Sequence, residues 1–286
     1  GLQELEQVRL LLEGRSVVDW RRLAFRDRAR AERFLTLNGF DPSADADRAH
    51  LRYLHDTSLE YLVEALGLPE VRTPLNEGGD MVDLLFAASD DGPGQSEAMV
   101  LFKVMHILHH ATGRELAARL PSPSRELFHR VETRVYDAVD GLKSSGIRVA
   151  EFSGSRKTRS SVLTKLLCRT DTVAAEIHDR LRFRVVTETL SDLFGALVYL
   201  TSELFPFNYV VPGASRNDLI DFAGTVEGNP HLSGLIGHLQ RPLVEAEAEA
   251  TPLNEWNQPN EFSGSSYKMI NFVVDMPVRV ADLAEE

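Results

Sequence analysis

The sequence predicts an α+β protein, with a helical first half followed by a second half in which strands and helices alternate. Two observations predict this order. Up to about residue 145, apolar residues recur at helical spacing and glycines stand where several helices should end. From residue 147 onward, segments with alternating polar and apolar residues are separated by helical patterns. We therefore expect a helical N-terminal domain over residues 1–145 and an α+β domain over residues 146–286.

Helical patterns account for most of the first half. Leu2, Leu5, Val8 and Leu12 share one face of a helix that Gly14 should end. Further helices are expected over residues 20–38, 47–66, 97–120 and 124–144, with a glycine directly after the first of these. Between them, the stretch MVDLLFAAS is expected to be a short helical or extended segment.

The second half should contain three helical or loop segments between its strands. Strands are expected over residues 147–152, 181–186, 209–211 and 267–274, helices over 160–170 and 192–204, and loops over 222–260. In the second strand, Leu181, Phe183 and Val185 alternate with Arg182 and Arg184. This alternation predicts a half-buried strand with a basic outer face.

Composition excludes several classes of protein. With 286 residues, 43% of them hydrophobic, the chain can bury one large core or two modest ones. It has no apolar run of eighteen residues and no basic leader, so we expect neither a membrane span nor a signal peptide. Cys168, the only cysteine, cannot form an internal disulfide, which favours a cytoplasmic location. A formal net charge of −12 argues against duplex DNA as a partner.

Residues 154–186 reverse the sign of that charge. They contain eight basic and three acidic residues, a local balance that suits an anionic ligand. A Gly/Ser turn at Gly154 is expected to open a helix on which Lys157, Ser161 and Lys165 share one face. Unpaired backbone N–H groups at the start of a helix favour anions, so a triphosphate would fit there. A plain solvated helix with ordinary lysines is the alternative.

Asp179 and the two strand arginines extend this candidate site. A carboxylate at the mouth of a strand can bind Mg²⁺, which takes one or two carboxylates together with phosphate oxygens. The guanidinium groups of Arg182 and Arg184 match phosphate geometry. The alternatives are an ordinary turn aspartate and two exposed strand arginines.

These segments resemble the synthetase domain of the RelA/SpoT homologues, the alarmone synthetases. That family has the motifs G-R-x-K-x-x-x-S-x-x-x-K-L, D-L-x-A-x-R-V and N-G-Y-x-S-L-H. The residues that match the first two motifs at the same offsets are Gly154, Lys157, Ser161, Lys165 and Leu166, then Asp179, Phe183, Arg184 and Val185. The stretch GSSYKMIN matches the third motif at Gly264, Tyr267 and Ile270. The resemblance extends from residue 147 to residue 280.

The resemblance implies a mixed-sheet nucleotidyltransferase-like fold that transfers pyrophosphate from ATP to a 3′-hydroxyl of GDP, GTP or a tRNA end. It implies that Lys157 and Lys165 hold ATP phosphates beside Ser161, that Asp179 binds Mg²⁺, and that Tyr267 stacks on the acceptor base. Such transfer relies on positioning and on charge neutralisation by metal and cations. Gly154, Arg156, Arg182 and Arg184 complete the set of nucleotide-binding candidates.

The chain also departs from the family, which leaves a second hypothesis open. Ser155 precedes Arg156, Met269 and Asn271 replace the Ser and His of the third motif, and no counterpart of the final E-V-Q-I-R-T strand precedes Glu286. The alternative to an enzyme is therefore a catalytically degenerate nucleotide sensor or partner-binding protein on the same fold. A plain helical scaffold with an α+β appendage is the third. The helical half would serve regulation, inhibition or a homo-oligomer.

Other motifs are weaker. His106 and His110 in MHILHH stand four residues apart, a spacing that can ligate a metal, but we favour a packing role because no third ligand is evident. The pair His55 and Asp56 lacks the second histidine motif of a metal-dependent phosphohydrolase. Cys168 is expected to be a core thiol. Serine-hydrolase and P-loop motifs are missing from the sequence.

Overall fold

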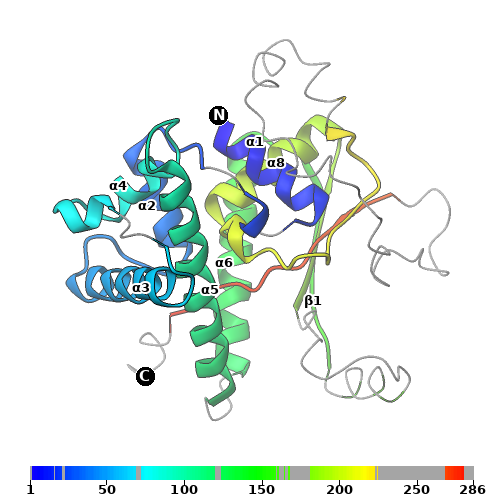
Figure 1. Cartoon of the computed structure of the whole chain (residues 1–286). Helices are drawn as coiled ribbons and strands as arrows, with labels where there is room; N and C mark the ends of the chain where they lie inside the picture. Colours follow the sequence, from blue (N-terminus) through cyan, green and yellow to red (C-terminus); the bar gives the residue numbers. More distant parts are fainter. Residues whose placement is uncertain are drawn as a thin grey trace.

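The computed structural model describes residues 2–15, 17–20, 23–68, 72–119, 124–158, 160, 164, 167, 181–222, 224 and 268–279. Over these residues the chain combines helices with two small antiparallel sheets, which confirms the α+β class. In Figure 1, helices α2, α3 and α4 lie on one side, α5 and α6 stand in the middle, and β1 lies on the other side below α1 and α8.

The helices of the first half are α1 Leu2–Glu13, α2 Arg28–Leu37, α3 Asp45–Glu64, α4 Met81–Ala87, α5 Gln95–Arg119 and α6 Ser124–Ser144. Two 3₁₀ turns, η1 Val17–Asp19 and η2 Pro74–Glu77, connect them. The MVDLLFAAS stretch forms α4, whose N-cap Asp80 and Asp83 make reciprocal capping bonds. Most of the predicted helices are confirmed to within two residues at each end.

The helix predicted over 20–38 is wrong in its first part. It begins only at Arg28, because the Asp27 carboxylate caps it by accepting a hydrogen bond from the Ala29 N–H at 2.7 Å. Before it, Trp20, Leu23 and Phe25 are buried in non-helical chain. The end is as predicted: Gly39 follows the Asn38 C-cap with a φ of 92°, a conformation that glycine adopts without strain.

The second half contains α8 Leu190–Glu203, η4 Phe207–Tyr209 and four strands, β1 Val149–Arg156, β2 Leu181–Thr187, β3 Arg216–Asn217 and β4 Ile270–Asn271. Strand β1 pairs antiparallel with β2, and β3 pairs antiparallel with β4. The predicted strand at 209–211 is instead a 3₁₀ turn followed by a single bridge between Val210 and Val274. Of the predicted helix over 160–170, residues 160, 164 and 167 are described, and they are helical.

Gly154 does not open a turn, which corrects the expected turn and helix start. Strand β1 continues through Gly154 and Ser155 to Arg156, and these residues pair with Phe183, Arg182 and Leu181 of β2. The β1–β2 pairing continues through position 154 because glycine has no side chain to clash there. A Cβ at Gly154 would lie 3.2 Å from both the Phe183 ring and the Tyr136 hydroxyl.

Two apolar clusters hold the fold together. The first joins α2, α3, α4 and α5 around Trp20 and Phe34, and it includes Phe207 from the second half. The second combines residues of α1 and α6 with α8, and the strand side chains Phe152, Phe183 and Phe272 pack against it. Both clusters therefore draw on residues from each side of position 145. The division into domains 1–145 and 146–286 stays a prediction.

Among the residues that the structure describes, no helix has both the length and the hydropathy needed to cross a membrane. The longest described helix, α5, carries charged and histidine side chains along its length.

Candidate functional site

We call the antiparallel pair of strands β1 and β2, which residues 157–180 separate in the sequence, the β1–β2 hairpin. Its outer face carries two of the predicted phosphate-binding arginines. Arg182 and Arg184 are exposed, and their cross-strand partners are Ser155 and Ser153. Directly paired residues of an antiparallel ladder share one face of the sheet. The hairpin thus presents two guanidinium groups beside two hydroxyl groups on one exposed face, which we call the basic face.

The inner face of the same hairpin is apolar and holds it in place. Phe152, Phe183 and Val185 pack against the second cluster, and the Phe152 and Phe183 rings stack with centroids 6.3 Å apart. The Tyr136 ring of α6 meets Phe152 edge-on at 5.2 Å. Because this face is anchored by aromatic packing, the basic face has a fixed orientation relative to α6.

Arg156 belongs to the inner face rather than to the basic face. Its guanidinium group forms an ion pair with Glu132 at 2.8 Å and lies over the Phe128 ring at 5.2 Å from the centroid. These contacts fasten the end of β1 to α6. The structure therefore separates Arg156 from Arg182 and Arg184, with which the sequence had grouped it.

The remaining predicted site residues are divided between described and undescribed positions. Lys157 directly follows β1 and is half-buried. Outside the described residues lie Ser161, Lys165, Asp179 and Tyr267. Cys168 also lies outside them, so its expected place in the core stays a prediction. The predicted convergence of lysines, hydroxyl and carboxylate on one polyphosphate therefore remains a prediction.

Sequence reasoning missed Ser153 and Ser155. The signal was present in the stretch EFSGSR, where Phe152 and Gly154 alternate with the two serines as strand residues do. Assigning Gly154 to a turn concealed that alternation. The serines contribute hydroxyl donors next to the arginines, a combination that suits phosphate oxygens.

Replacing Gly154 with valine is expected to lower the free energy of unfolding by about 1–3 kcal/mol, because the added atoms would overlap Phe183 and Tyr136. Chemical denaturation followed by circular dichroism measures this change. Gly113→Ala in α5 is the matched control, since nothing lies within 4 Å of its Cβ position. Equal stability of the two variants would contradict the close approach at Gly154.

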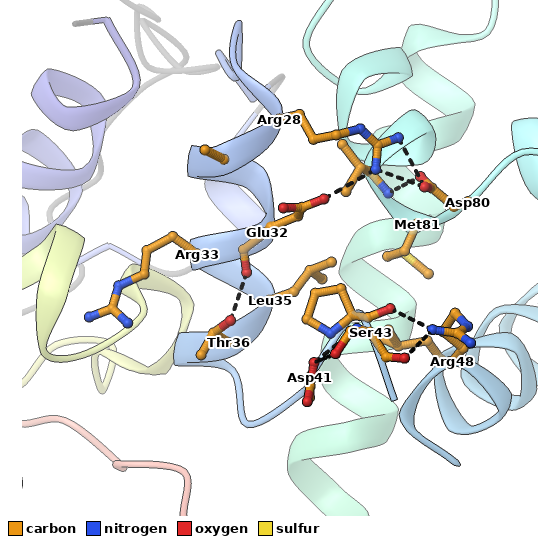
Figure 2. Close-up of a pocket in the computed structure, with 14 residues that line it drawn as sticks. Arg28, Glu32, Arg33, Leu35, Thr36, Asp41, Ser43, Arg48, Asp80 and Met81 are labelled. Carbon is orange, nitrogen blue, oxygen red and sulfur yellow. Dashed lines mark hydrogen bonds and ion pairs between the residues drawn. The ribbon is translucent and has the colours of Figure 1, made fainter. Parts of the chain in front are cut away.

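A hollow of about 470 Å³ lies between α2, α3 and the start of α4. Figure 2 shows its lining, with Arg28 and Arg48 on either side of the apolar Leu35 and Met81, whereas the Arg33 side chain extends away from them toward Glu203. The volume is in the range of small-molecule sites.

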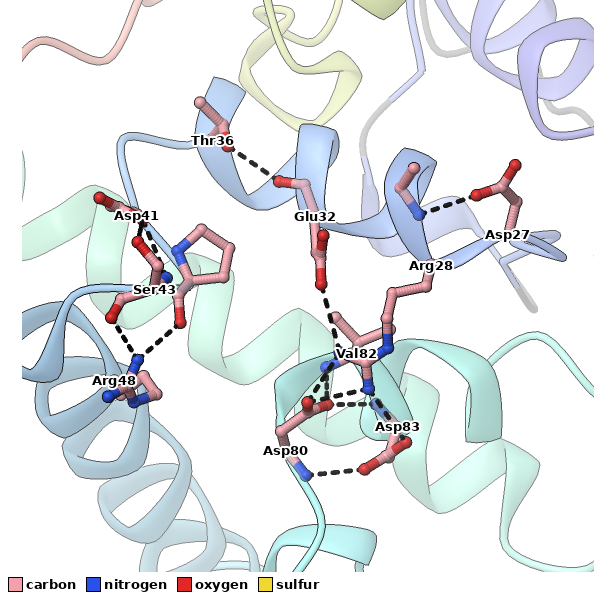
Figure 3. A network of polar contacts seen from close by, with 12 residues as sticks. Asp27, Arg28, Glu32, Thr36, Asp41, Ser43, Arg48, Asp80, Val82 and Asp83 are labelled. Atoms are coloured by element: carbon pink, nitrogen blue, oxygen red, sulfur yellow. Dashed lines mark hydrogen bonds and ion pairs between the residues drawn. The ribbon is translucent and has the colours of Figure 1, made fainter.

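The arginines that line this hollow are engaged in hydrogen bonds and ion pairs. Arg28 donates two bonds of 2.9 Å to Asp80, and Arg48 donates to the carbonyl of Pro42 at 3.0 Å. Figure 3 shows two separate groups of contacts: Arg28 and Asp80 join α2 to α4, and Arg48 joins α3 to the connection that precedes it. Although partial burial acts in the opposite direction, the bonds from Arg28 and from the α4 backbone lower the pKa of Asp80. We interpret the bonds between Arg28 and Asp80 as a polar clamp between α2 and α4.

The histidines of MHILHH form a partly buried aromatic cluster with Tyr209. The His106 and His110 rings stack at 5.7 Å, and both lie edge-on to Tyr209, at 5.1 and 5.2 Å. The Asn208 side-chain amide lies 2.9 Å from the His106 Nδ1. Burial and the neighbouring His110 and His109 lower the pKa of His106 from 6.5 to about 3. This geometry is that of a packing cluster, which agrees with the role favoured from sequence.

His55 is a second buried histidine with both ring nitrogens engaged. Its Nδ1 lies 2.6 Å from an Asp56 oxygen and its Nε2 lies 2.9 Å from the Thr73 hydroxyl. Within the described ranges, no group of three or more His, Cys, Asp or Glu side chains is placed to hold a metal ion.

Comparison with known proteins gives no assignment: no protein-family model, curated protein or solved structure matches this chain. The function must therefore be argued from the residues themselves.

Proposed function

We propose that this chain is a nucleotide-binding protein of RelA/SpoT-like type that holds the phosphates of a purine nucleoside triphosphate, with Mg²⁺, at the basic face of the β1–β2 hairpin. The observation that carries the proposal is the pairing of Arg182 with Ser155 and of Arg184 with Ser153 on one exposed face. Guanidinium groups bind phosphate oxygens through two parallel hydrogen bonds, and hydroxyl groups add further donors.

Local charge favours the same ligand class. The chain as a whole is acidic, so the basic face is a local positive patch that attracts anions. A long polyanion such as duplex DNA would extend beyond this patch and be repelled by the net negative charge of the rest of the chain. A compact polyphosphate fits a face of two arginines better than a long polyanion does. In this proposal Lys157, Lys165, Ser161, Asp179 and Tyr267 keep the roles that the resemblance implies.

The reaction that goes with this site is pyrophosphate transfer from ATP to the 3′-hydroxyl of GDP, GTP or a tRNA end: the hydroxyl oxygen bonds to the β-phosphorus, the bond between the α- and β-phosphates breaks, AMP leaves and the hydroxyl proton is released. Arg182 and Arg184 would neutralise charge on the transferred group, and Asp179 would hold Mg²⁺, which would supply electrostatic stabilisation. Incubation of the protein with labelled ATP and each acceptor tests this step. ATP binding without transfer to any acceptor would support the alternative, a nucleotide sensor.

The double variant R182A/R184A tests the binding claim. Each substitution removes charge-assisted hydrogen bonds that contribute about 1.5–3 kcal/mol, so the affinity for ATP–Mg²⁺ should fall at least tenfold. Isothermal titration calorimetry measures the dissociation constants. R26A/R119A, which removes two exposed arginines elsewhere, should bind like the unaltered protein. The proposal fails if the unaltered protein shows no affinity for ATP, or if the two double variants bind equally well.

A further inference from the structure

Residues 268–279, which we call the C-terminal segment, cross the molecule from the strands to the helices. Figure 1 shows the segment in red, running from the side of β1 toward α3 and α5. Its first part belongs to the sheet region: β4 pairs with β3, and Val274 bridges to Val210. Ile270, Phe272 and Val274 pack against the same cluster as Phe152 and Phe183 on the inner face of the hairpin.

The last part of the segment is held by polar contacts to three helices. The Asp275 carboxylate lies 3.2 Å from His110 and 3.4 Å from Arg114, both on α5. The Pro277 carbonyl accepts a bond of 2.8 Å from Arg134 of α6. Arg279 pairs with Asp47 of α3 at 2.7 and 3.2 Å, across a sequence separation of 232 residues.

The contacts at the very end of the segment differ in kind from the earlier ones. Residues 270–276 have ladder bonds, a 2.9 Å bond from the Asp275 N–H to the Tyr209 carbonyl, and apolar packing that includes Met276, whereas residues 277–279 are held mainly by side-chain bonds of Arg134 and Arg279 at partly exposed positions. Such contacts are individually weak, so this end of the segment can detach at low cost while the core stays folded. Arg279 is linked to the polar hollow through Asp47, whose carboxylate also accepts a bond of 2.6 Å from the N–H of Asp41 at the hollow's edge.

We propose that the C-terminal segment is a regulatory strap through which α3 and α5 control the affinity of the hairpin for its nucleotide. With the strap docked, Phe272 supports the cluster that orients the β1–β2 hairpin. With residues 277–279 detached, the core stays folded but the segment is no longer tethered to α3, so Phe272 is held less tightly and the basic face is oriented less rigidly. The inference rests on the proposed function for its ligand, but the mechanical coupling is a property of the fold alone.

Coupling of this kind is reciprocal, so nucleotide binding should also favour the docked strap. The binding-competent state needs only to be more populated when Arg279 and Asp47 are paired. Partners or ligands that compete for Asp47 or the hollow would then weaken nucleotide binding. This assigns a regulatory role to the helical half of the chain.

The test uses the full chain and the variant R279Q, which breaks the partly exposed pair with Asp47 without changing a residue of the apolar clusters. R279K keeps the charge, and R26Q breaks the exposed Arg26–Asp90 pair, at 2.7 Å, which lies away from the strap. R279Q should weaken ATP–Mg²⁺ binding by about fivefold or more, the lower end of typical coupling between sites. R279K and R26Q should bind within about twofold of the unaltered protein, a difference of about 0.4 kcal/mol.

Hydrogen exchange without nucleotide separates the strap from the proposed function. R279Q should speed exchange of amides in 149–156 and 181–187, and R26Q should not. Unchanged exchange and unchanged affinity in R279Q would overturn the strap while leaving nucleotide binding intact. Faster hairpin exchange in a protein that shows no ATP affinity would support the mechanical coupling and refute the proposed ligand.

Discussion

Replacing Trp20 with alanine is expected to lower the free energy of unfolding by about 3–5 kcal/mol. The Trp20 side chain is fully buried and stacks on Phe207, with ring centroids 4.2 Å apart and planes 10° from parallel. Phe207 in turn stacks on Phe34 of α2 at 5.2 Å. The substitution would leave a cavity at the point where the second half of the chain enters the first apolar cluster.

The variant Trp20→Phe separates the contribution of aromatic packing to stability from the effect of the buried indole nitrogen. Among the described residues, the Trp20 Nε1 has no hydrogen-bond partner although it is buried. Phenylalanine keeps most of the stacking surface and removes that unsatisfied group, so its effect should be less than half that of alanine. Tyr53→Ala at a 62% exposed position is the control and should change stability by under about 0.5 kcal/mol.

Urea denaturation of the three variants measures these differences. A loss below about 1 kcal/mol for Trp20→Ala would mean that the stacked pair does not anchor the two halves. Loss of only part of the unfolding transition would instead show that the first cluster unfolds separately from the second.

The helices could be predicted from sequence because local signals specify them. In α6, Ser124 and Ser144 stand at the ends of a strongly amphipathic stretch, and the structure has the same bounds. The false extension of α2 to Trp20 had another cause. Apolar residues before Asp27 follow a helical pattern, yet burial of Trp20 and Phe25 in the core decides their conformation.

The site was harder to predict because strand pairing is non-local. Nothing near Gly154 in sequence reveals that Phe183 lies beside it, so a glycine followed by serine suggested a turn. Once β2 pairs, Arg156 turns toward Glu132 while Arg182 and Arg184 remain on the exposed face. The strap was not foreseen either, since Arg279 and Asp47 meet only through the tertiary fold.

Lowering the pH from 6.5 to 4.5 is expected to reduce the free energy of unfolding by about 3–5 kcal/mol through two histidines. Burial, with repulsion from neighbouring histidines, lowers the pKa of His106 to about 3 and that of His109 to about 4, from 6.5. In this interval the unfolded chain binds protons that the folded chain excludes. The stabilisation is therefore complete above pH 6.5 and is lost as the pH falls toward 4.

This window is separate from that of the carboxylates. Asp41, Asp80 and Asp192 have pKa values lowered from 3.8, so the stability they contribute is present above that value and is lost only at more acidic pH. Stability measured at closely spaced pH values between 6.5 and 4.5 therefore reports mainly on histidines.

The variant H106Q/H109Q removes both titrating rings and keeps polar side chains in the cluster. It should be less stable than the unaltered protein at pH 7.5, but its stability should change much less between pH 6.5 and 4.5. His129→Gln, at an exposed position of α6, should keep the full pH dependence. If the double variant follows the same pH profile as the unaltered protein, the two rings are protonated in the folded state. The packing of His106 against Tyr209 would then have to accommodate a charged imidazolium.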